Sequence, residues 1–324
     1  MNELDVRQLR YFVAVAEELH FGRAAERLSI AQPPLSRTIS DMERMMGVAL
    51  LERTTRQVRL TAAGEVLLRD ARLVLDSIAA ATRRAQRAGQ GDATLRLAVK
   101  VDYDGGLLPR VLAAYHRDGN PRPVELMLGD LGEQVQALRD GRADVALVPA
   151  PFDDRGLDTR PVLTEPRFVA LAAGDPLAGR PSLRLADLKG KVLADGTPAT
   201  LGPVPSEPAT DDGAAPCRDL THLLNLIELG RAVWFPPASV AARNRRSGVT
   251  YVPVEDLTPA ELVLAWPRGA QSPAVSAFVR AVSAVVDEDP DTATEPRGDA
   301  LASLAGVSDL NGQVSGRPKG DAGR

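Results

Sequence analysis

Cysteine and histidine are scarce in this sequence. Cys217 is the only cysteine among 324 residues, which excludes an internal disulfide and any metal cluster built on several thiolates. The three histidines, His20, His116 and His222, lie far apart, and we interpret each as structural or solvated. The sequence also has no phosphate-cradling glycine loop, no metal-ligand spacing and no nucleophile elbow. We therefore expect no enzymatic activity, no metal ion and no cofactor.

Long apolar runs are missing too. No stretch of about 18 apolar residues is available to span a bilayer. The N-terminus has neither an uninterrupted apolar core nor a small-residue cleavage site, unlike a signal peptide. We therefore expect a cytoplasmic protein without membrane association. The composition, 44% hydrophobic and 25% charged, is typical of a globular protein, and the length predicts two or three domains.

Charge is distributed unevenly along the chain. Residues 1–90 contain 14 arginines and 11 acidic residues, a local charge of +3, so the rest of the chain carries −7 of the total of −4. Such an asymmetry favours a polyanion as the partner of the N-terminal end.

Helical apolar spacing predicts three helices near the N-terminus. A first helix is expected over residues 4–18 and a second over about 23–28, with Gly22 as its N-cap. The buried face of the third helix recurs in steps of 4, 3 and 4 at Leu35, Ile39, Met42 and Met46.

Two adjacent prolines stand at the start of the third helix. A residue before proline is pushed out of the helical region, so Gln32 and Pro33 are expected to be extended. Pro34 is then near the first helical position, where its missing N–H is one that the helix never uses. The prolines therefore predict a sharp, rigid helix start.

The segment after Gly47 changes to short extended pieces, LLERTTRQVRL, which predict a small β-wing carrying Arg53, Arg56 and Arg59. Thr61 is the expected N-cap of a long helix over residues 62–88. The apolar residues of that helix form a heptad seam, which favours a partner helix: Leu67, Ala71, Val74, Ile78, Ala81 and Ala85.

A helix-turn-helix followed by a basic wing is the layout in which the later helix enters the DNA major groove. Gln32 suits adenine, Arg37 suits guanine or phosphate, and wing arginines suit phosphate or the minor groove. The predicted DNA-contacting residues are Gln32, Pro33, Pro34, Ser36, Arg37, Ser40, Arg53 and Arg56. The alternative is a three-helix bundle whose arginine-rich face has no DNA partner.

The chain beyond the linker at 89–93 alternates strand-like and helical runs, which predicts βαβ units in two α/β lobes. The expected strands include KVLADG and AVWFPP. Residues 199–216 are predicted to be a mobile loop, and the segment from about 288 to the C-terminus is predicted to be disordered.

The run FGRAAERLSIAQPPLSRTISDMERMMGVALLERTTRQVRLTAAG resembles the winged helix-turn-helix signature of LysR-type transcriptional regulators. The resemblance implies an α/β protein overall: an all-α N-terminal winged helix-turn-helix (1–61), a linker helix (62–90) and a two-lobed α/β effector domain (91–287) like a periplasmic binding protein. Lobe one would comprise 95–163 plus 268–287, and lobe two 164–267, with crossing strands within 162–171 and 261–267.

The resemblance also implies partners. These are double-stranded DNA with a pseudo-palindromic operator, a small-molecule effector, and further copies of the chain in a homodimer or homotetramer; RNA polymerase is a candidate partner. A solute-binding transport receptor is the alternative, disfavoured by the missing signal peptide and by the DNA-binding head. Cys217 beside Arg218 is either a redox-sensing thiol or an incidental one.

In such a fold the effector lies between the lobes, near strand C-termini and helix N-termini. The expected effector-binding residues are Val101, Asp102, Tyr103, Gly129, Asp130, Pro149, Ala150, Thr197, Ala199, Thr200 and Phe235. Relatives with acidic effectors often have serine or threonine in the first two of these loops, where this chain has aspartates. We therefore hypothesise a neutral or amine-bearing effector; alternatively, Asp102 and Asp130 cap the following helices.

Overall fold

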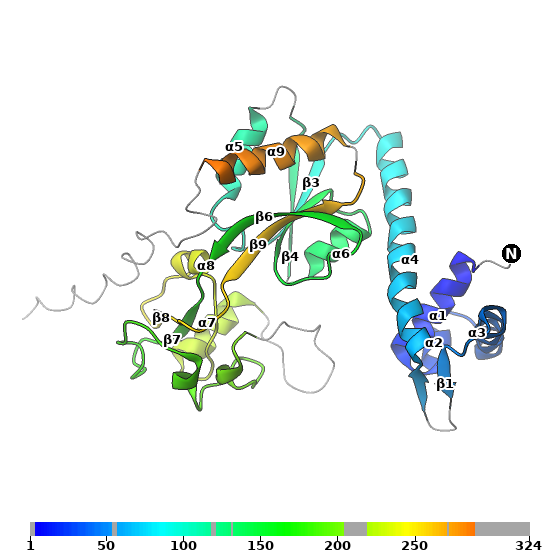
Figure 1. Cartoon of the computed structure of the whole chain (residues 1–324), viewed down its shortest axis with the longest axis horizontal. Coiled ribbons are helices and arrows are strands. Elements are labelled where there is room, and N and C mark those ends of the chain that lie inside the picture. Colours follow the sequence, from blue (N-terminus) through cyan, green and yellow to red (C-terminus); the bar gives the residue numbers. More distant parts are fainter. Residues whose placement is uncertain are drawn as a thin grey trace, which may run out of the picture. The chain divides into compact units, whose positions relative to one another are not determined.

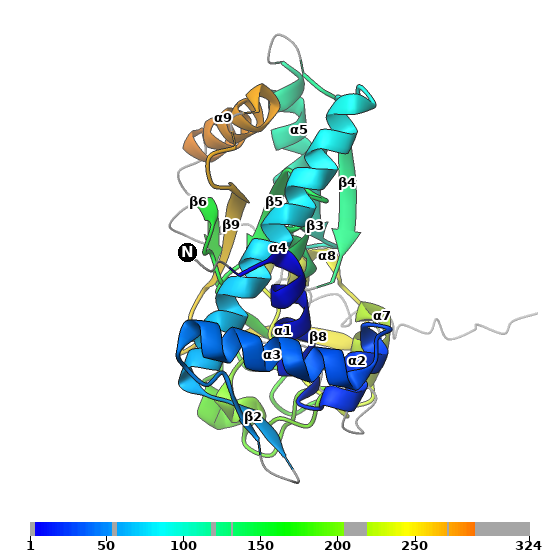
Figure 2. The ribbon, with the colours of Figure 1, turned by 90° about the vertical axis from the view of Figure 1, so that its right-hand side faces the viewer.

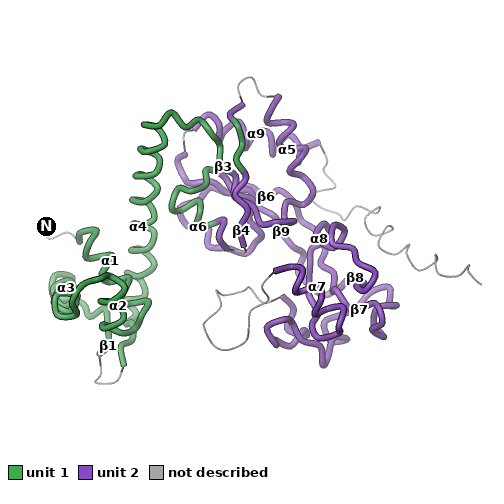
Figure 3. Tube along the Cα trace, turned by 180° about the vertical axis from the view of Figure 1, so that it is seen from behind, with its two compact units in different colours: residues 1–96, 123–125, 135–144 green, residues 97–122, 126–134, 145–324 purple. Residues whose placement is uncertain are grey.

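The computed structural model of the protein describes residues 4–53, 57–117, 121–130, 132–203, 219–270 and 272–288. The chain divides into two compact units (Figure 3): unit 1 comprises 1–96, 123–125 and 135–144, and unit 2 the remainder. Arg56, Cys217, most of the predicted mobile loop and the predicted disordered tail from 289 onward lie outside the described residues.

Unit 1 begins with three helices, α1 (Val6–Glu18), α2 (Phe21–Arg27) and α3 (Gln32–Met46), gathered around one end of the long helix α4 (Ala62–Gly89) (Figure 2). The N-cap of α2 is His20, whose Nδ1 accepts hydrogen bonds from the backbone N–H groups of Gly22 (3.1 Å) and Arg23 (3.2 Å). The prediction that Gly22 caps this helix was therefore wrong, because the imidazole supplies an acceptor two residues earlier.

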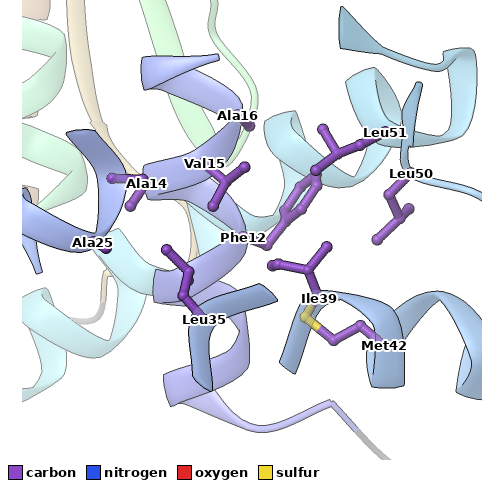
Figure 4. Close-up of a cluster of buried hydrophobic side chains, with 11 residues drawn as sticks. Phe12, Ala14, Val15, Ala16, Ala25, Leu35, Ile39, Met42, Leu50 and Leu51 are labelled. Carbon is purple, nitrogen blue, oxygen red and sulfur yellow. The ribbon is translucent and has the colours of Figure 1, made fainter. Parts of the chain in front are cut away.

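The core of these helices confirms the predicted apolar face of α3 (Figure 4). Leu35, Ile39 and Met42 have no exposed surface and lie around the ring of Phe12, which is also fully buried. Met46 is 38% exposed, so its predicted burial was wrong. The helix ends there, because Gly47 adopts a left-handed conformation (φ 71°).

The start of α3 lies earlier than predicted. Ala31 is the extended N-cap (ψ 149°), and Gln32, Pro33 and Pro34 occupy the first three helical positions. The expectation that Gln32 and Pro33 are extended was wrong. Both prolines still lie within the first turn, where backbone N–H groups have no helical partner, and their fixed φ suits a helix.

The predicted wing forms as two short antiparallel strands, β1 (Leu51–Arg53) and β2 (Val58–Leu60). Thr61 then caps α4 as expected, with its Oγ1 accepting from the N–H of Gly64 at 3.0 Å and donating to the carbonyl of Ala49 at 2.7 Å. A Cβ on Gly64 would lie 2.1 Å from the carbonyl oxygen of Leu50, so glycine permits this close approach.

Within unit 1, α4 also packs against residues 135–144. Arg87 donates to both carboxylate oxygens of Asp144 (3.1 and 3.2 Å) and to the carbonyl of Gly141 (3.1 Å). A Cβ on Gly141 would lie 2.7 Å from the Cα of Ala80. Part of the predicted heptad seam is used inside the chain, because Ala71 is buried, while Val74 is 44% exposed.

The first lobe contains a five-stranded sheet in the order β4-β3-β5-β9-β6, whose strands are labelled in Figure 2 and beside which α5 and α9 are seen in Figure 1. Its strands are β3 (Leu95–Lys100), β4 (Val124–Gly129), β5 (Val145–Pro149), β6 (Leu157–Glu165) and β9 (Ala260–Pro267). Strands β3 and β5 are parallel, and β9 runs antiparallel to both β5 and β6. The helices of this lobe are α5 (Leu108–His116), α6 (Glu133–Arg139) and α9 (Pro273–Asp287).

The position of β9 corrects the expected lobe boundary. Residues 260–267 were assigned to lobe two, but they pair along their length with strands of the first sheet.

Helices α5 and α9 lie side by side (Figure 1), and the rings of Tyr115 and Phe278 meet edge to face with their centroids 5.5 Å apart.

The second lobe has a smaller antiparallel pair, β7 (Phe168–Ala172) and β8 (Val249–Pro253), with α7 (Leu220–Glu228) and α8 (Ala238–Arg243). The strands expected at KVLADG and AVWFPP are not formed; these segments make the isolated bridges Val192–Pro198, Ala170–Trp234 and Arg167–Pro237. KVLADG ends in Asp195 and Gly196, which disfavour a strand, and AVWFPP ends in two prolines, which lack the N–H that a strand ladder needs.

Among the described residues, no helix is both long and apolar enough to cross a membrane. Over the same ranges, no three His, Cys, Asp or Glu side chains are grouped in a way that would hold a metal ion.

Candidate functional site

The outer face at the start of α3 is the first candidate site. Burial of Leu35, Ile39 and Met42 turns the intervening polar residues outward. Gln32, Pro33, Pro34, Arg37 and Ser40 are exposed, and Ser36 is half-buried. The guanidinium of Arg37 makes no hydrogen bond or ion pair with any described residue, so it is available to an external partner.

The two wing arginines that the structure describes have different surroundings, and the DNA contacts expected of Arg53 and Arg56 stay predictions. Arg53 donates to Glu43 Oε2 at 2.9 Å, and its guanidinium carbon lies 4.9 Å from the ring centre of Phe21. Arg59 lies on β2 opposite Glu52 and is exposed, and its guanidinium makes no hydrogen bond or ion pair with any residue that the structure describes. Strand alternation between the half-buried Val58 and Leu60 was the signal that would have selected Arg59.

Glu43 fixes the wing to α3, although no sequence motif pointed to this residue. Its Oε1 accepts from the backbone N–H groups of Leu50 (3.0 Å) and Leu51 (3.1 Å), while Oε2 binds Arg53. One partly buried carboxylate thus holds both the start of β1 and the wing arginine. The sequence gave no sign of this contact, because no local pattern links a carboxylate on a helix to the strand that follows the next turn.

The second candidate site lies at the C-terminal ends of strands in the first lobe. Val101, Asp102 and Tyr103 follow β3, and Asp102 has a left-handed backbone (φ 64°), which is uncommon for a residue with a side chain. Gly129 ends β4, and the N–H of Asp130 donates to Glu133 Oε2 at 2.9 Å. Pro149 ends β5, and Ala150 follows it.

Asp104, and not Asp102, accepts from the N-terminal end of α5. Its carboxylate oxygens accept from the N–H groups of Gly106 (3.4 Å) and Leu108 (3.3 Å). The same carboxylate, only 6% exposed as a residue, forms an ion pair with Arg243 at the end of α8, with Nη2 at 3.3 Å. Asp102 instead accepts a long bond from Asn244 Nδ2 (3.5 Å). The capping alternative for Asp102 was therefore wrong.

Three further ionisable groups lie where the lobes meet. Both carboxylate oxygens of Glu165 accept from Ser239, one from its N–H and one from its hydroxyl, each at 2.7 Å. Arg167 donates one long hydrogen bond, from Nη1 to the carbonyl of Phe235 (3.4 Å). Lys100 Nζ lies 5.2 Å from the ring centre of Tyr103. We call this set the interlobe cluster: Lys100, Asp102, Tyr103, Asp104, Glu165, Arg167, Ser239, Arg243 and Asn244.

Burial shifts the protonation equilibria of the cluster. It raises the pKa of Glu165, against the opposing hydrogen bonds from Ser239, and lowers the pKa of Arg167. Burial also raises the pKa of Tyr103 to about 12, although the charge of Arg167 acts in the opposite direction. Perturbed groups of this kind often mark functional sites.

The residues predicted from lobe two are not all available to a ligand. Ala199 and Phe235 are 0% and 3% exposed and belong to the apolar core with Val169 and Leu171, so the expectation that their side chains line the site is corrected. Phe235 contributes its carbonyl to Arg167 instead. Thr197 precedes the 3₁₀ helix Ala199–Leu201, Thr200 lies within it, and neither follows a strand.

Comparison with known proteins gives a consistent result. Residues 6–65 match the family described as bacterial regulatory helix-turn-helix protein, lysR family, and residues 88–287 match the LysR substrate binding domain. The Hca operon transcriptional activator HcaR of Escherichia coli (strain K12) is 32% identical over 289 residues, covering 86% of this chain and 97% of that protein. The HTH-type transcriptional regulator BenM of Acinetobacter baylyi is 30% identical over 269 residues, covering 78% and 86%.

A solved structure shows the same likeness. The crystal structure of CbnR, a LysR family transcriptional regulator, is similar with a TM-score of 0.51 and 26% identity, covering 87% of this chain and 99% of that one.

Proposed function

Because the chain belongs to the LysR family of DNA-binding transcriptional regulators, we propose that the exposed start of α3 reads its operator. The observation that carries this proposal is the guanidinium of Arg37, which has no partner among the described residues, on a helix whose opposite face is buried in a core. The transport-receptor alternative is set aside by the family match.

In this proposal Gln32 pairs with adenine and Arg37 with guanine, because each side chain presents two hydrogen-bonding groups in a plane that matches one base edge. Pro33 and Pro34 hold the first turn rigid, so little conformational freedom is lost on binding. Ser36 and Ser40 contact neighbouring bases or phosphates. Arg59 supplies a phosphate contact from the wing.

We further propose that a small-molecule effector binds at the interlobe cluster. The support is chemical: ionisable side chains from both lobes converge there, and burial perturbs Tyr103, Glu165 and Arg167. The predicted loop residues Val101, Gly129, Asp130, Pro149, Ala150, Thr197 and Thr200 stay candidates for the surrounding contacts.

The proposal includes self-association. The exposed part of the α4 seam supplies a dimer interface, and two copies present two α3 helices to the halves of a pseudo-palindromic operator. Tetramer formation and contact with RNA polymerase stay predictions. The protein would act in the cytoplasm, where the DNA it regulates is located.

Selection from a random duplex library tests the DNA-reading role. The purified chain should enrich a two-fold symmetric site, and fluorescence anisotropy should then show that Arg37→Ala loses more affinity for that site than for random DNA, by about 1–3 kcal/mol of discrimination. Equal losses on both duplexes would refute base reading by Arg37.

A further inference from the structure

Helix α8 belongs to lobe two, but side chains of lobe one bind it at both ends. Its last residue, Arg243, forms a two-pronged ion pair with Asp104, in which Nη1 contacts Oδ1 and Nη2 lies 3.3 Å from Oδ2. Its second residue, Ser239, donates two hydrogen bonds of 2.7 Å to Glu165 at the end of β6. Figure 1 shows α8 where lobe two adjoins β6 and β9.

The apolar clusters of lobe two do not include lobe one. Two such clusters consist entirely of residues within 168–257, and α8 contributes Ala238 and Ala241 to one of them. The chain crosses between the lobes twice, at 166–167 and at 254–259. Lobes with separate apolar clusters and two short connections are able to rotate relative to each other, so polar contacts such as those of α8 decide their arrangement.

The Asp104 carboxylate is fixed on lobe one independently of Arg243. The residue is only 6% exposed, and its two oxygens also accept from the backbone N–H groups of Gly106 (3.4 Å) and Leu108 (3.3 Å). The Arg243 side chain is 37% exposed, so its charge is already partly hydrated. One partner is therefore rigid, and the other is able to move into water when the pair separates.

We infer that the Asp104–Arg243 pair is a latch, meaning a contact that holds the two lobes together without any ligand and sets the fraction of molecules whose lobes are apart. Separation hydrates both charges, which offsets part of the attraction that is lost, so opening costs far less than unfolding a core. Removal of either charge disfavours the closed arrangement alone and shifts the population towards the open one. The inference goes beyond DNA reading and effector binding, because it needs no small molecule.

Distances between spin labels on the two lobes of the full-length chain test the latch. One label is attached to α5 of lobe one through Ala113→Cys, and the other to α7 of lobe two through Thr221→Cys; both positions are exposed. Cys217→Ser removes the native thiol. An excess of unlabelled chain ensures that only distances within one chain are measured by double electron–electron resonance.

The chain with an intact pair should give one predominant short distance. Arg243→Gln and Asp104→Asn should each raise the population at longer distance about tenfold, because each leaves the other charge without its partner. Asparagine keeps an acceptor for the N–H of Leu108, so the start of α5 is preserved. Arg243→Lys, which keeps the charge, should give an intermediate population. The double variant should open no further than either single variant, because one contact is lost only once.

Arg246→Gln is the matched control. Arg246 donates to Asn225 Oδ1 at 3.0 Å, and both residues belong to lobe two, so the same substitution removes a hydrogen bond within one lobe. It should leave the distance distribution unchanged. Thermal melts of every variant check that the chain remains folded.

Three results would overturn the inference: unchanged distances in both Arg243→Gln and Asp104→Asn, equal opening in Arg246→Gln, or a double variant that opens by the sum of the two single effects. Binding of the selected duplex is measured on the same preparations. A chain that prefers its duplex but shows no latch rejects the latch alone, whereas loss of that preference in the unaltered chain rejects the proposed DNA-reading role.

Discussion

At the scale of single residues, two wing arginines that look alike in the sequence have different surroundings. Arg53 is held by Glu43 and by the ring of Phe21, whereas Arg59 is free among the described residues. We therefore expect Arg53→Ala to lower the free energy of unfolding by about 1 kcal/mol, because a partly buried ion pair and a cation–π contact are lost.

Arg59→Ala should instead leave the unfolding free energy unchanged and weaken all duplexes evenly. The slope of log affinity against log salt should fall by about one phosphate contact. Urea unfolding and anisotropy at several salt concentrations measure the two effects. A salt slope that falls for Arg53→Ala but not for Arg59→Ala would reverse this assignment.

Glu165 predicts a pH dependence of stability. Burial raises its pKa in the folded chain above the ordinary value of 4.5, so the folded state binds more protons than the unfolded state between those two values. Stability from this group is therefore lost as the pH rises from 4.5 through the folded pKa. Glu165→Gln should raise the unfolding free energy at pH 7.5 relative to the unaltered chain, and the gain should shrink towards pH 4.5. A gain independent of pH would exclude this cause.

The sequence was sufficient for some residue assignments and insufficient for others. Burial of Leu35, Ile39 and Met42, and hence exposure of Arg37, followed from helical periodicity alone. The pairs Glu43–Arg53 and Asp104–Arg243 depend on contacts between segments whose spacing no local pattern encodes, and they decide which charges are free.

At the scale of elements, α2 depends on an unusual cap. The Nδ1 of His20 accepts from two backbone N–H groups, so this nitrogen must be unprotonated. His20→Ala should lower the unfolding free energy by about 1 kcal/mol, whereas His20→Asp, which keeps an acceptor, should retain most of it. Equal losses in the two variants, measured by urea unfolding, would show that the imidazole ring and not its acceptor matters.

The contact between α4 and residues 135–144 depends on a glycine. Gly141 has φ 76°, and an added Cβ would meet the Cα of Ala80 at 2.7 Å. Gly156 is the matched control, because its φ of 79° imposes the same backbone strain while no atom lies within 4 Å of an added Cβ. Gly156→Ala should cost about 1–2 kcal/mol for the left-handed backbone, and Gly141→Ala should cost about 1–3 kcal/mol more from the clash. Similar melting temperatures for the two variants would argue against close packing of α4.

The start of α3 and the sheet to which β9 belongs could not be predicted from the periodicity of apolar residues alone. The first turn of α3 includes both prolines, because the N–H groups of a first turn have no helical partner and proline removes nothing there. Residues before proline generally avoid the helical conformation, and that general preference predicted a later start of the helix. Strand β9 was correctly expected near 261–267, but only its pairing with β5 and β6 assigns it to the first sheet. Such pairing is a long-range property.

At the scale of the whole molecule, α4 is the element through which two copies of the chain would associate. Its predicted seam includes exposed apolar positions, of which Val74, 44% exposed, is the largest. Isolated exposed valines are unremarkable, but a valine in a heptad repeat on a 28-residue helix favours a coiled-coil partner. Val74→Glu places a charge in that seam, and its burial against a second charge would be unfavourable.

We expect Val74→Glu to shift the chain towards monomer in sedimentation equilibrium at micromolar concentration. Gln86→Glu is the control, because it adds the same charge at an exposed position that lies off the seam. The variant should also lose the affinity gained from two half-sites, so that a symmetric operator and a single half-site bind with similar strength. A Val74→Glu chain that remains a dimer and still prefers the symmetric site would exclude this part of α4 from the interface, and self-association would have to arise in unit 2.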